Sequence, residues 1–297
     1  MIRVLLFLVL LVQHGLAQNK EVSITIDDVP NTSLYRLQNF NSVLLDRIGK
    51  MNIPVAIFIN EKNIYANEFN AKNLNGLTAW LKSELVTAGN HSYSHLNYAD
   101  TTLEFFQRDI LRGEILTTQI LNQRPRYFRF PFNSLGEDSL SHVSIKKFLN
   151  DNQYINTPFT VESEDWVFNN LYEAALKNNE TAKASHIGQQ YLEHTLALFQ
   201  YFENLSVELY GRNIKHIYLC HDNRLNADYL PELVQRLQAK GYAFISLDKA
   251  LEDNIYLSNE YYTGRYGFSW LYRWEKDEAK RKALMRKEPV NATLQGK

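Results

Sequence analysis

Strand-like runs alternate with helical patterns along most of this 297-residue chain, and this alternation constrains the fold more than any other feature. Residues 22–26 alternate apolar and polar side chains, while residues 54–59 and 214–220 form continuous apolar runs. Strands that alternate with helices favour parallel βαβ units. We predict about seven such strands, and a hydrophobic content of 45% suits one large domain of the α/β barrel class.

The expected elements follow from these patterns in chain order. We predict helices over residues 34–51, 74–88, 101–121, 139–150 and 228–240. We predict strands over residues 22–26, 54–59, 154–161, 214–220 and 242–247, and a further strand that ends at Arg129. Residues 166–213 carry no strand pattern and are predicted to form one or two long helices.

Polar residues with catalytic chemistry follow several of the predicted strands. They are Asp27, Asp28, Arg129, Asp165 and His221. In a barrel of parallel strands all such ends open on the same face, so these side chains are expected to converge. Each also has a plainer interpretation, as a helix cap, a surface ion-pair member, a loop residue or a core histidine. Their common position is what favours a functional site.

The segment HisSerTyrSerHis at residues 91–95 predicts a metal site. Two imidazoles four residues apart would lie on one face of a helical turn, where both could reach one ion. Asp28 would complete a set of two histidines and one carboxylate with a position open for water, which is typical of catalytic zinc. A chance pair among the 8 histidines of the chain is the alternative.

Charge and cysteine content narrow the class of partner. A net charge of -1 gives no basic surface, so we expect no nucleic-acid partner. Cys220 is the only cysteine and lies in an apolar run, so it is expected to be a small buried hydrophobe, and no intramolecular disulfide is available. The sequence leaves the oligomeric state open.

The first 17 residues have the pattern of a secretory signal. Arg3 precedes an apolar core over residues 4–12, and small residues follow near Ala17. We predict a cleaved signal peptide at residues 1–17 and export to a periplasm or the outside medium, with an uncleaved anchor as the alternative. The apolar run is too short for a membrane span, which needs ~20 residues, and we expect no membrane span elsewhere.

The C-terminal residues 253–297 depart from the strand and helix alternation. They include the aromatic residues Tyr261, Tyr262, Tyr266, Phe268, Trp270, Tyr272 and Trp274. Aromatic side chains with a polar edge can pack as a flap on a barrel or stack on sugar rings, and we favour packing. We therefore predict a barrel over residues 18–252, followed by an aromatic-rich extension with a charged tail.

Five ordered segments resemble the motifs of the polysaccharide deacetylases, the NodB-homology group known as carbohydrate esterase family 4. These segments are ThrIleAspAspValPro, HisSerTyrSerHis, ArgPheProPhe, GluSerGluAspTrp and LeuCysHisAsp, and the resemblance runs from about residue 22 to about residue 247. It implies a distorted (β/α)7 TIM-like barrel, here with an inserted helical segment near residues 171–212.

The resemblance also implies a metal site with its base. Asp28, His91 and His95 would hold one divalent ion, with zinc favoured and cobalt or nickel as alternatives. Asp27 would be the general base that takes a proton from water. Arg129 would hold that base ionised and oriented.

The remaining matched residues would complete the reaction. His221 would be the general acid, and Asp165 the carboxylate paired with it. The backbone N–H of Phe132 would bind the oxyanion, while Trp166 and Leu219 would line the pocket for the acetyl methyl group.

Three features depart from the family pattern. Val29 and Asn133 stand where glycine is usual or common, so the backbone turns beside the metal and the substrate groove are expected to differ. The helical segment over residues 171–212 is longer than expected and could cover part of the cleft.

The leading hypothesis is an exported, metal-dependent hydrolase that removes acetyl groups from a polysaccharide or oligosaccharide, with N-acetyl favoured and O-acetyl as the alternative. The inserted helices and altered glycine positions motivate an alternative, a C–N hydrolase acting on a small non-sugar amide or imide. A third hypothesis is a non-catalytic glycan-binding protein that uses the aromatic extension.

Overall fold

A curled parallel sheet forms the centre of the molecule, and the computed structural model describes residues 20–291. Its strands are β1 (Lys20–Val29), β2 (Val55–Ile59), β3 (Val86–Asn90), β4 (Tyr127–Phe128), β5 (Ile155–Asn156), β6 (Val161–Glu162), β7 (Lys215–His221) and β8 (Tyr242–Phe244). Seven of them pair in the order β5-β4-β3-β2-β1-β7-β6, and β8 pairs with the start of β1. The signal peptide predicted at residues 1–17 lies outside the described residues.

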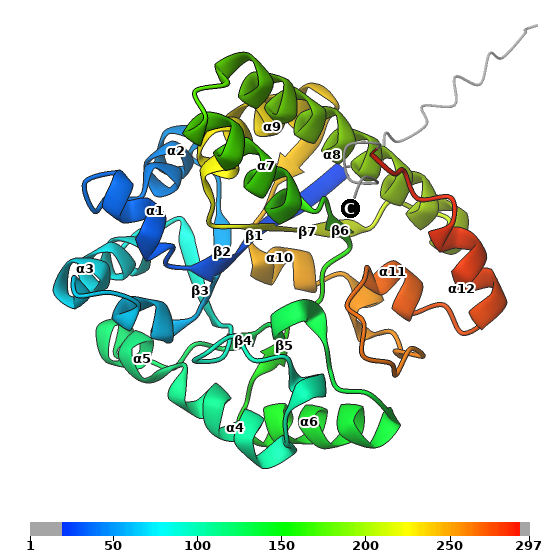
Figure 1. Cartoon of the computed structure of the whole chain (residues 1–297). Helices are drawn as coiled ribbons and strands as arrows, with labels where there is room; N and C mark the ends of the chain where they lie inside the picture. Colours follow the sequence, from blue (N-terminus) through cyan, green and yellow to red (C-terminus); the bar gives the residue numbers. More distant parts are fainter. Residues whose placement is uncertain (1–19, 292–297) are drawn as a thin grey trace, which may run out of the picture.

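Helices surround the sheet (Figure 1). They are α1 (Thr32–Leu37), α2 (Val43–Met51), α3 (Asn70–Leu81), α4 (Leu103–Arg112), α5 (Ile115–Leu121), α6 (Ser139–Asp151), α7 (Asp165–Lys177), α8 (Thr181–Tyr210), α9 (Arg224–Ala239), α10 (Leu247–Leu251), α11 (Trp270–Arg273) and α12 (Glu278–Met285). Short 3-10 turns include η3 (Pro131–Asn133). The architecture confirms the predicted distorted (β/α)7 barrel, in which β5 and β6 are the two ends of the sheet.

Two predicted long helices are each divided in the structure. The helix predicted over residues 34–51 is α1 and α2, because Asn39 and Phe40 adopt positive φ between them. The helix predicted over residues 101–121 is α4 and α5, which Gly113 separates. A Cβ at Gly113 would approach the backbone of Ser92 and Tyr93 to 2.6 Å, so this break admits the loop that carries the two histidines.

Three predicted elements were placed wrongly. The helix over residues 74–88 ends at Leu81, and the strand β3 follows it; the polar Thr87 and Asn90 had hidden the strand pattern. The predicted strand over residues 154–161 is instead the pair of two-residue strands β5 and β6. The last strand is shorter than predicted, since Leu247 begins α10.

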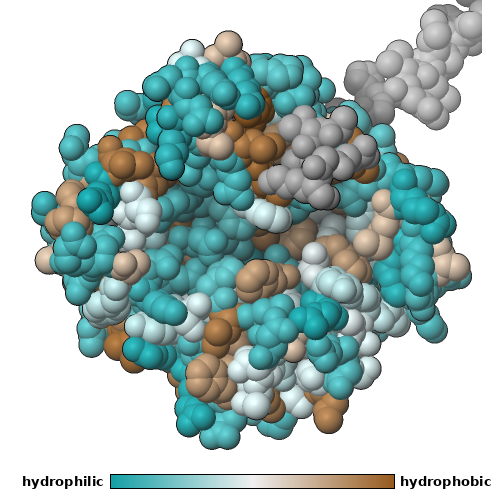
Figure 2. Space-filling model, in the orientation of Figure 1, coloured by the Kyte–Doolittle hydropathy of each residue, from teal (hydrophilic) through white to brown (hydrophobic). Residues whose placement is uncertain are grey.

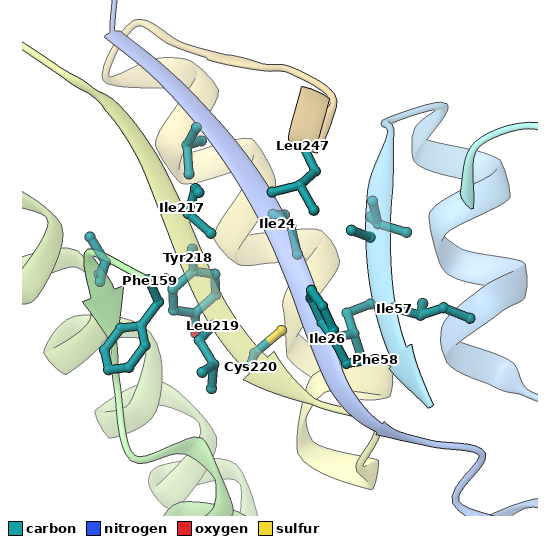
Figure 3. Close-up of a cluster of buried hydrophobic side chains, with 14 of the residues drawn as sticks. Ile24, Ile26, Ile57, Phe58, Phe159, Ile217, Tyr218, Leu219, Cys220 and Leu247 are labelled. Atoms are coloured by element: carbon teal, nitrogen blue, oxygen red, sulfur yellow. The ribbon is translucent and has the colours of Figure 1, made fainter. Parts of the chain in front are cut away.

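Apolar side chains from the strands form the core of the barrel (Figure 3). Those in view include Ile24 and Ile26 of β1, Ile57 of β2, and Ile217 of β7, with Leu247 of α10 packed beside them. Burying one such side chain stabilises the fold by about 1.5–3 kcal/mol. Cys220 is a free, fully buried thiol within this cluster, as the sequence predicts.

The aromatic extension packs onto the barrel at the segment between β5 and β6. The Trp270 backbone N–H donates to the Phe159 carbonyl at 3.0 Å, and Ser269 Oγ donates to the Thr160 carbonyl at 2.7 Å. Trp270 and Tyr272 are buried, in agreement with the packing interpretation.

The helices described within residues 20–291 include none that is long and apolar enough to cross a membrane.

Candidate active site

A cleft of about 720 Å³ opens at the carboxyl ends of the strands and appears as a hollow in the face of the molecule (Figure 2). Eight predicted residues line it: Asp27, Asp28, His91, His95, Phe132, Trp166, Leu219 and His221. The other two predicted residues, Arg129 and Asp165, are fully buried behind its wall. The structure therefore brings the ten predicted side chains together at one cleft and its wall.

Asp28, His91 and His95 form the one group among the described residues whose ligand atoms are arranged to hold a metal ion. One ligand atom from each side chain lies within 4.8 Å of the other two. His91 Nδ1 lies 2.8 Å from the Arg129 carbonyl oxygen and donates to it, which leaves Nε2 free to coordinate. Burial, with the neighbouring His95, lowers the pKa of His91 to about 3, so the ring is neutral, as a metal ligand must be. This donor set of two imidazoles and one carboxylate fits zinc.

The two histidines converge from a loop and not from a helical turn, so that part of the sequence argument was wrong. Ser92 and His95 both have positive φ, at 62° and 56°. The loop is held from two sides, because Asn60 Nδ2 donates to the His91 carbonyl at 2.6 Å and Asp109 accepts from the Tyr93 and Ser94 segment. Backbone curvature brings the two rings to a centroid separation of 5.0 Å.

Asp27 is held by a buried cation. Arg129 Nη1 donates to Asp27 Oδ1 at 2.9 Å and to Thr25 Oγ1 at 2.6 Å. The guanidinium lies over the ring of Phe58, 4.4 Å from its centroid. Asp27 Oδ2 remains 3.7 Å from His91 Nε2, on the side of the metal group. One carboxylate oxygen is therefore fixed while the other faces the cleft.

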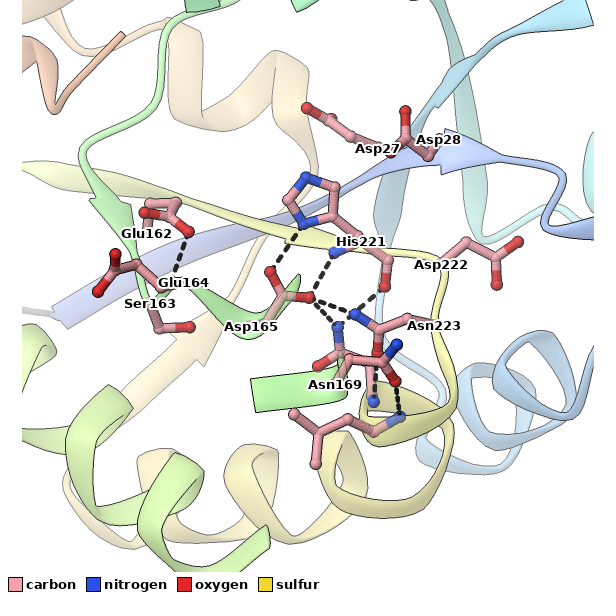
Figure 4. Close-up of polar contacts among 12 residues, drawn as sticks. Asp27, Asp28, Glu162, Ser163, Glu164, Asp165, Asn169, His221, Asp222 and Asn223 are labelled. Atoms are coloured by element: carbon pink, nitrogen blue, oxygen red, sulfur yellow. Dashed lines mark hydrogen bonds and ion pairs between the residues drawn. The ribbon is translucent and has the colours of Figure 1, made fainter. Parts of the chain in front are cut away.

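His221 and Asp165 form a second paired unit, and His221 of β7 lies next to Asp27 of β1 (Figure 4). His221 Nδ1 donates to Asp165 Oδ1 at 2.7 Å, while Asp165 Oδ2 accepts from Asn223 and Asn226. Burial lowers the pKa of His221, but the charge of Asp165 and the hydrogen bond to it outweigh that effect and raise the pKa to about 10. The ring is thus protonated at neutral pH and can donate a proton.

Exposed aromatic side chains stand at the edge of the cleft. Phe132 and Trp166 are each more than half exposed, and the Phe132 ring meets the His95 ring at a centroid distance of 4.8 Å. Leu219 of β7 is buried in the cleft floor. Together they give the polar site an apolar boundary.

The sequence analysis missed several polar cleft residues, among them Asn60, Glu162 and Asp222. Asn60 directly follows β2, so the rule that placed Asp27 at the end of β1 could have found it. Burial, with the nearby Asp165 charge, raises the pKa of Glu162 to about 8. Burial also raises the pKa of Asp222 to about 6, although this carboxylate accepts hydrogen bonds from Tyr35 and Asn31.

The inserted helical segment does not cover the cleft in the described part of the chain. Trp166, Asn169 and Asn170 of α7 line it, but no residue of the range 171–212 does. α8 instead packs against α7 and α9 on the outer side of the barrel. The inserted segment therefore leaves the lining of the cleft to other elements.

Comparison with known proteins finds similarity to the polysaccharide deacetylases. Residues 15–148 match the family model for polysaccharide deacetylase. The peptidoglycan-N-acetylglucosamine deacetylase of Bacillus cereus is 23% identical over 146 residues, which are 49% of this chain and 46% of that protein. Over these residues the chain is similar to the polysaccharide deacetylases. The family model ends before the segments that hold Asp165 and His221, so the placement of those two rests on the geometry above.

Solved structures of the polysaccharide deacetylase family share the fold. A CE4 family pseudoenzyme from Bacillus anthracis matches with a TM-score of 0.53 and 18% identity, over 78% of this chain and 66% of that one. A family 4 carbohydrate esterase from Streptomyces lividans, in complex with acetate, matches with a TM-score of 0.50 and 18% identity, over 79% of this chain and 97% of that one. The chain spans less than half the length of the Bacillus cereus relative.

Proposed function

We propose that this protein is an exported, metal-dependent hydrolase that removes N-acetyl groups from amino sugars of a polysaccharide or oligosaccharide. One observation carries the proposal: a three-ligand metal group lies in the same cleft as a carboxylate fixed by a buried arginine and a protonated histidine fixed by a buried carboxylate. Amide hydrolysis needs a base for water and an acid for the leaving amine, and the cleft offers both.

Asp28, His91 and His95 are the residues that would hold the ion, with zinc favoured by their chemistry. When bound, a divalent ion supplies acidity to water and polarises the acetyl carbonyl. His91 keeps Nε2 available because its Nδ1 proton is engaged by the Arg129 carbonyl.

Asp27 would act as the base. Its free oxygen faces the cleft, while the hydrogen bond from Arg129 orients the carboxylate. Placement of this kind is worth about 10²–10⁴-fold in rate for a general base.

His221 would donate its Nε2 proton to the leaving nitrogen, because Nδ1 is engaged by Asp165. The Phe132 backbone N–H would donate to the carbonyl oxygen as negative charge develops there. Trp166 and Leu219 would bound the space for the acetyl methyl group.

Two further observations support the proposed substrate and compartment. The Bacillus cereus relative is named for peptidoglycan N-acetylglucosamine, and the cleft here has a volume of about 720 Å³. The signal pattern at residues 1–17 favours export to a compartment where such polymers lie.

Acetate release decides the function. The zinc-loaded protein would be incubated with chitin oligomers, peptidoglycan and acetylated xylan, before and after chelation. We expect acetate from N-acetylated amino sugars with metal only, and a loss of at least about 100-fold in kcat for Asp27→Asn. Asp151→Asn, at the exposed end of α6, is the matched control.

Three outcomes would contradict the proposal. Full activity after chelation or in Asp27→Asn would exclude the mechanism. Turnover of small amides or cyclic imides alone would favour the alternative C–N hydrolase. Glycan binding without any acetate release would favour a binding protein, a reading to be tested because a protein of this fold is described as a pseudoenzyme.

A further inference from the structure

The turn that carries Phe132 has an unusual backbone. Phe132 and Asn133 are consecutive residues with positive φ, at 55° and 50°. For residues with a side chain this conformation costs on the order of 1 kcal/mol each, and it persists only where the surroundings enforce it. The local hydrogen bonds of the turn, from Asn133 N–H to Phe130 and from Ser134 N–H to Pro131, come from the same short segment.

The C-terminal extension supplies an external contact to this turn. Arg273 Nη1 donates to the Asn133 carbonyl oxygen at 2.9 Å, across 140 residues of sequence. The Arg273 side chain is fully buried, its Nε pairs with Glu260, and its guanidinium lies 4.3 Å from the Trp270 ring centroid. Lys146 of α6 pairs with the other oxygen of Glu260 at 2.5 Å. Arg273 is thereby fixed on three sides, and it fixes the carbonyl in turn.

Gly267 of the extension lies in close contact with the same turn. A Cβ at Gly267 would overlap the Phe132 carbonyl oxygen and the Asn133 Cβ. The two backbones are therefore in direct contact, at a position that lines the cleft. Only glycine allows this approach.

The position of the turn matters to the site beside it. The Phe132 ring contacts His95 of the metal group, and the Phe132 backbone forms the cleft wall next to it. A displacement of this turn would move the wall of the cleft, and displacements near 1 Å can cost about 100-fold in rate.

We propose that Arg273 is a positioning residue: through the Asn133 carbonyl, and with Gly267, the C-terminal extension sets the Phe132 turn in its reactive position. The inference rests on the proposed function for its effect on catalysis. The role of Arg273 in holding the turn is independent of what the cleft hydrolyses.

Arg273→Lys is the principal variant. A lysine keeps a positive charge near Glu260, but it lacks the planar fork that reaches Glu260 and Asn133 together. Arg281→Lys is the matched control, since Arg281 lies in the same C-terminal region and donates to the Glu275 carbonyl. It shares the Tyr262 ring with Arg273, so the comparison isolates the contacts of Arg273 with Glu260 and Asn133. Gly267→Ala is a second variant, which displaces the turn from its other contact without touching the buried ion pair.

The first readout is the exchange of backbone amide hydrogens in residues 130–134, followed by mass spectrometry. We expect at least about tenfold faster exchange in Arg273→Lys and Gly267→Ala than in Arg281→Lys. Unchanged exchange in both variants, with both folded, would overturn the proposal whatever the protein's activity.

The second readout is kinetic. We expect kcat for acetate release to fall at least about tenfold, with KM and zinc affinity close to wild type, because the turn acts on the transition state. A rise in KM alone would overturn the catalytic part of the proposal. Absence of acetate release by the wild type would count against the proposed function, and the exchange result would still decide the role of Arg273.

Discussion

Two histidines in one cleft have pKa values that are shifted in opposite directions. Burial lowers the pKa of His91 to about 3, and its ring is neutral. Burial lowers that of His221 as well, but the Asp165 partner overcomes the effect and raises it to about 10. Titratable groups whose environments push their pKa values apart mark the division of labour in an active site. One ring is suited to bind a metal and the other to give up a proton.

Because Asp165 raises the pKa of His221, we predict that removing its charge changes how kcat depends on pH. Asp165→Asn removes the negative charge, so the His221 pKa should fall from about 10 towards its ordinary value of ~6.5. A raised pKa keeps the acid protonated up to that value, and kcat of the variant should accordingly decline above about pH 7, where the wild type still holds its rate. The measurement is kcat against pH, with Asp228→Asn on α9 as control; superimposable profiles would refute the role of Asp165.

Loss of either ligand histidine should weaken metal binding. We expect His91→Ala and His95→Ala each to lower zinc affinity at least about 100-fold by isothermal titration, because a three-residue site loses a donor. His186→Ala, on the exposed face of α8, should bind zinc as the wild type does. Equal affinity in all three variants would place the ion elsewhere.

At the scale of elements, the ends of strands were the predictable part of this site. Asp27 and His221 follow recognisable apolar runs, and parallel pairing sets them side by side on β1 and β7. The loop of residues 91–95 was located correctly but for the wrong reason, since its positive φ values come from contacts with Asn60 and α4 that the local sequence does not encode. The contact from Arg273 to Asn133 spans 140 residues and no periodicity reveals it.

The break between α4 and α5 gives a prediction of its own. Gly113→Ala would put a methyl group 2.6 Å from the backbone of Ser92 and Tyr93. We expect this overpacking to destabilise the fold by about 1–3 kcal/mol and to weaken zinc binding as the histidine loop shifts. The measurements are urea unfolding and zinc titration of the same samples.

Gly49→Ala is the matched control for that substitution. Gly49 lies inside α2 with no atom within 4 Å of an added Cβ. Alanine should stabilise the helix there by up to about 1 kcal/mol and leave zinc affinity unchanged. If Gly113→Ala behaved like Gly49→Ala, the loop would not depend on the helix break.

At the scale of the whole molecule, the C-terminal extension packs against the barrel, and we predict that the two fold as one unit. Four of its large side chains are buried: Trp270, Leu271, Tyr272 and Trp274. Each contributes about 1.5–3 kcal/mol by burial, and their sum is comparable to the total stability of about 5–15 kcal/mol that a domain has. The extension also lies where the sheet ends at β5 and β6, against Phe159 and Thr160.

A chain that ends at residue 252 should therefore fail to fold, although it retains every strand and every predicted site residue. We expect no cooperative thermal transition and no zinc binding for this truncation, because Trp270 and Tyr272 no longer cover the barrel where β5 and β6 end. Trp270→Ala in the full chain is a milder test, and we expect it to lower the free energy of unfolding in urea by about 3–5 kcal/mol. Tyr266→Ala is the control, because Tyr266 is largely exposed, and its free energy of unfolding should lie within about 0.5 kcal/mol of wild type. A stable, zinc-binding truncation would make the extension a separate appendage, and would leave Arg273 without a role in the cleft.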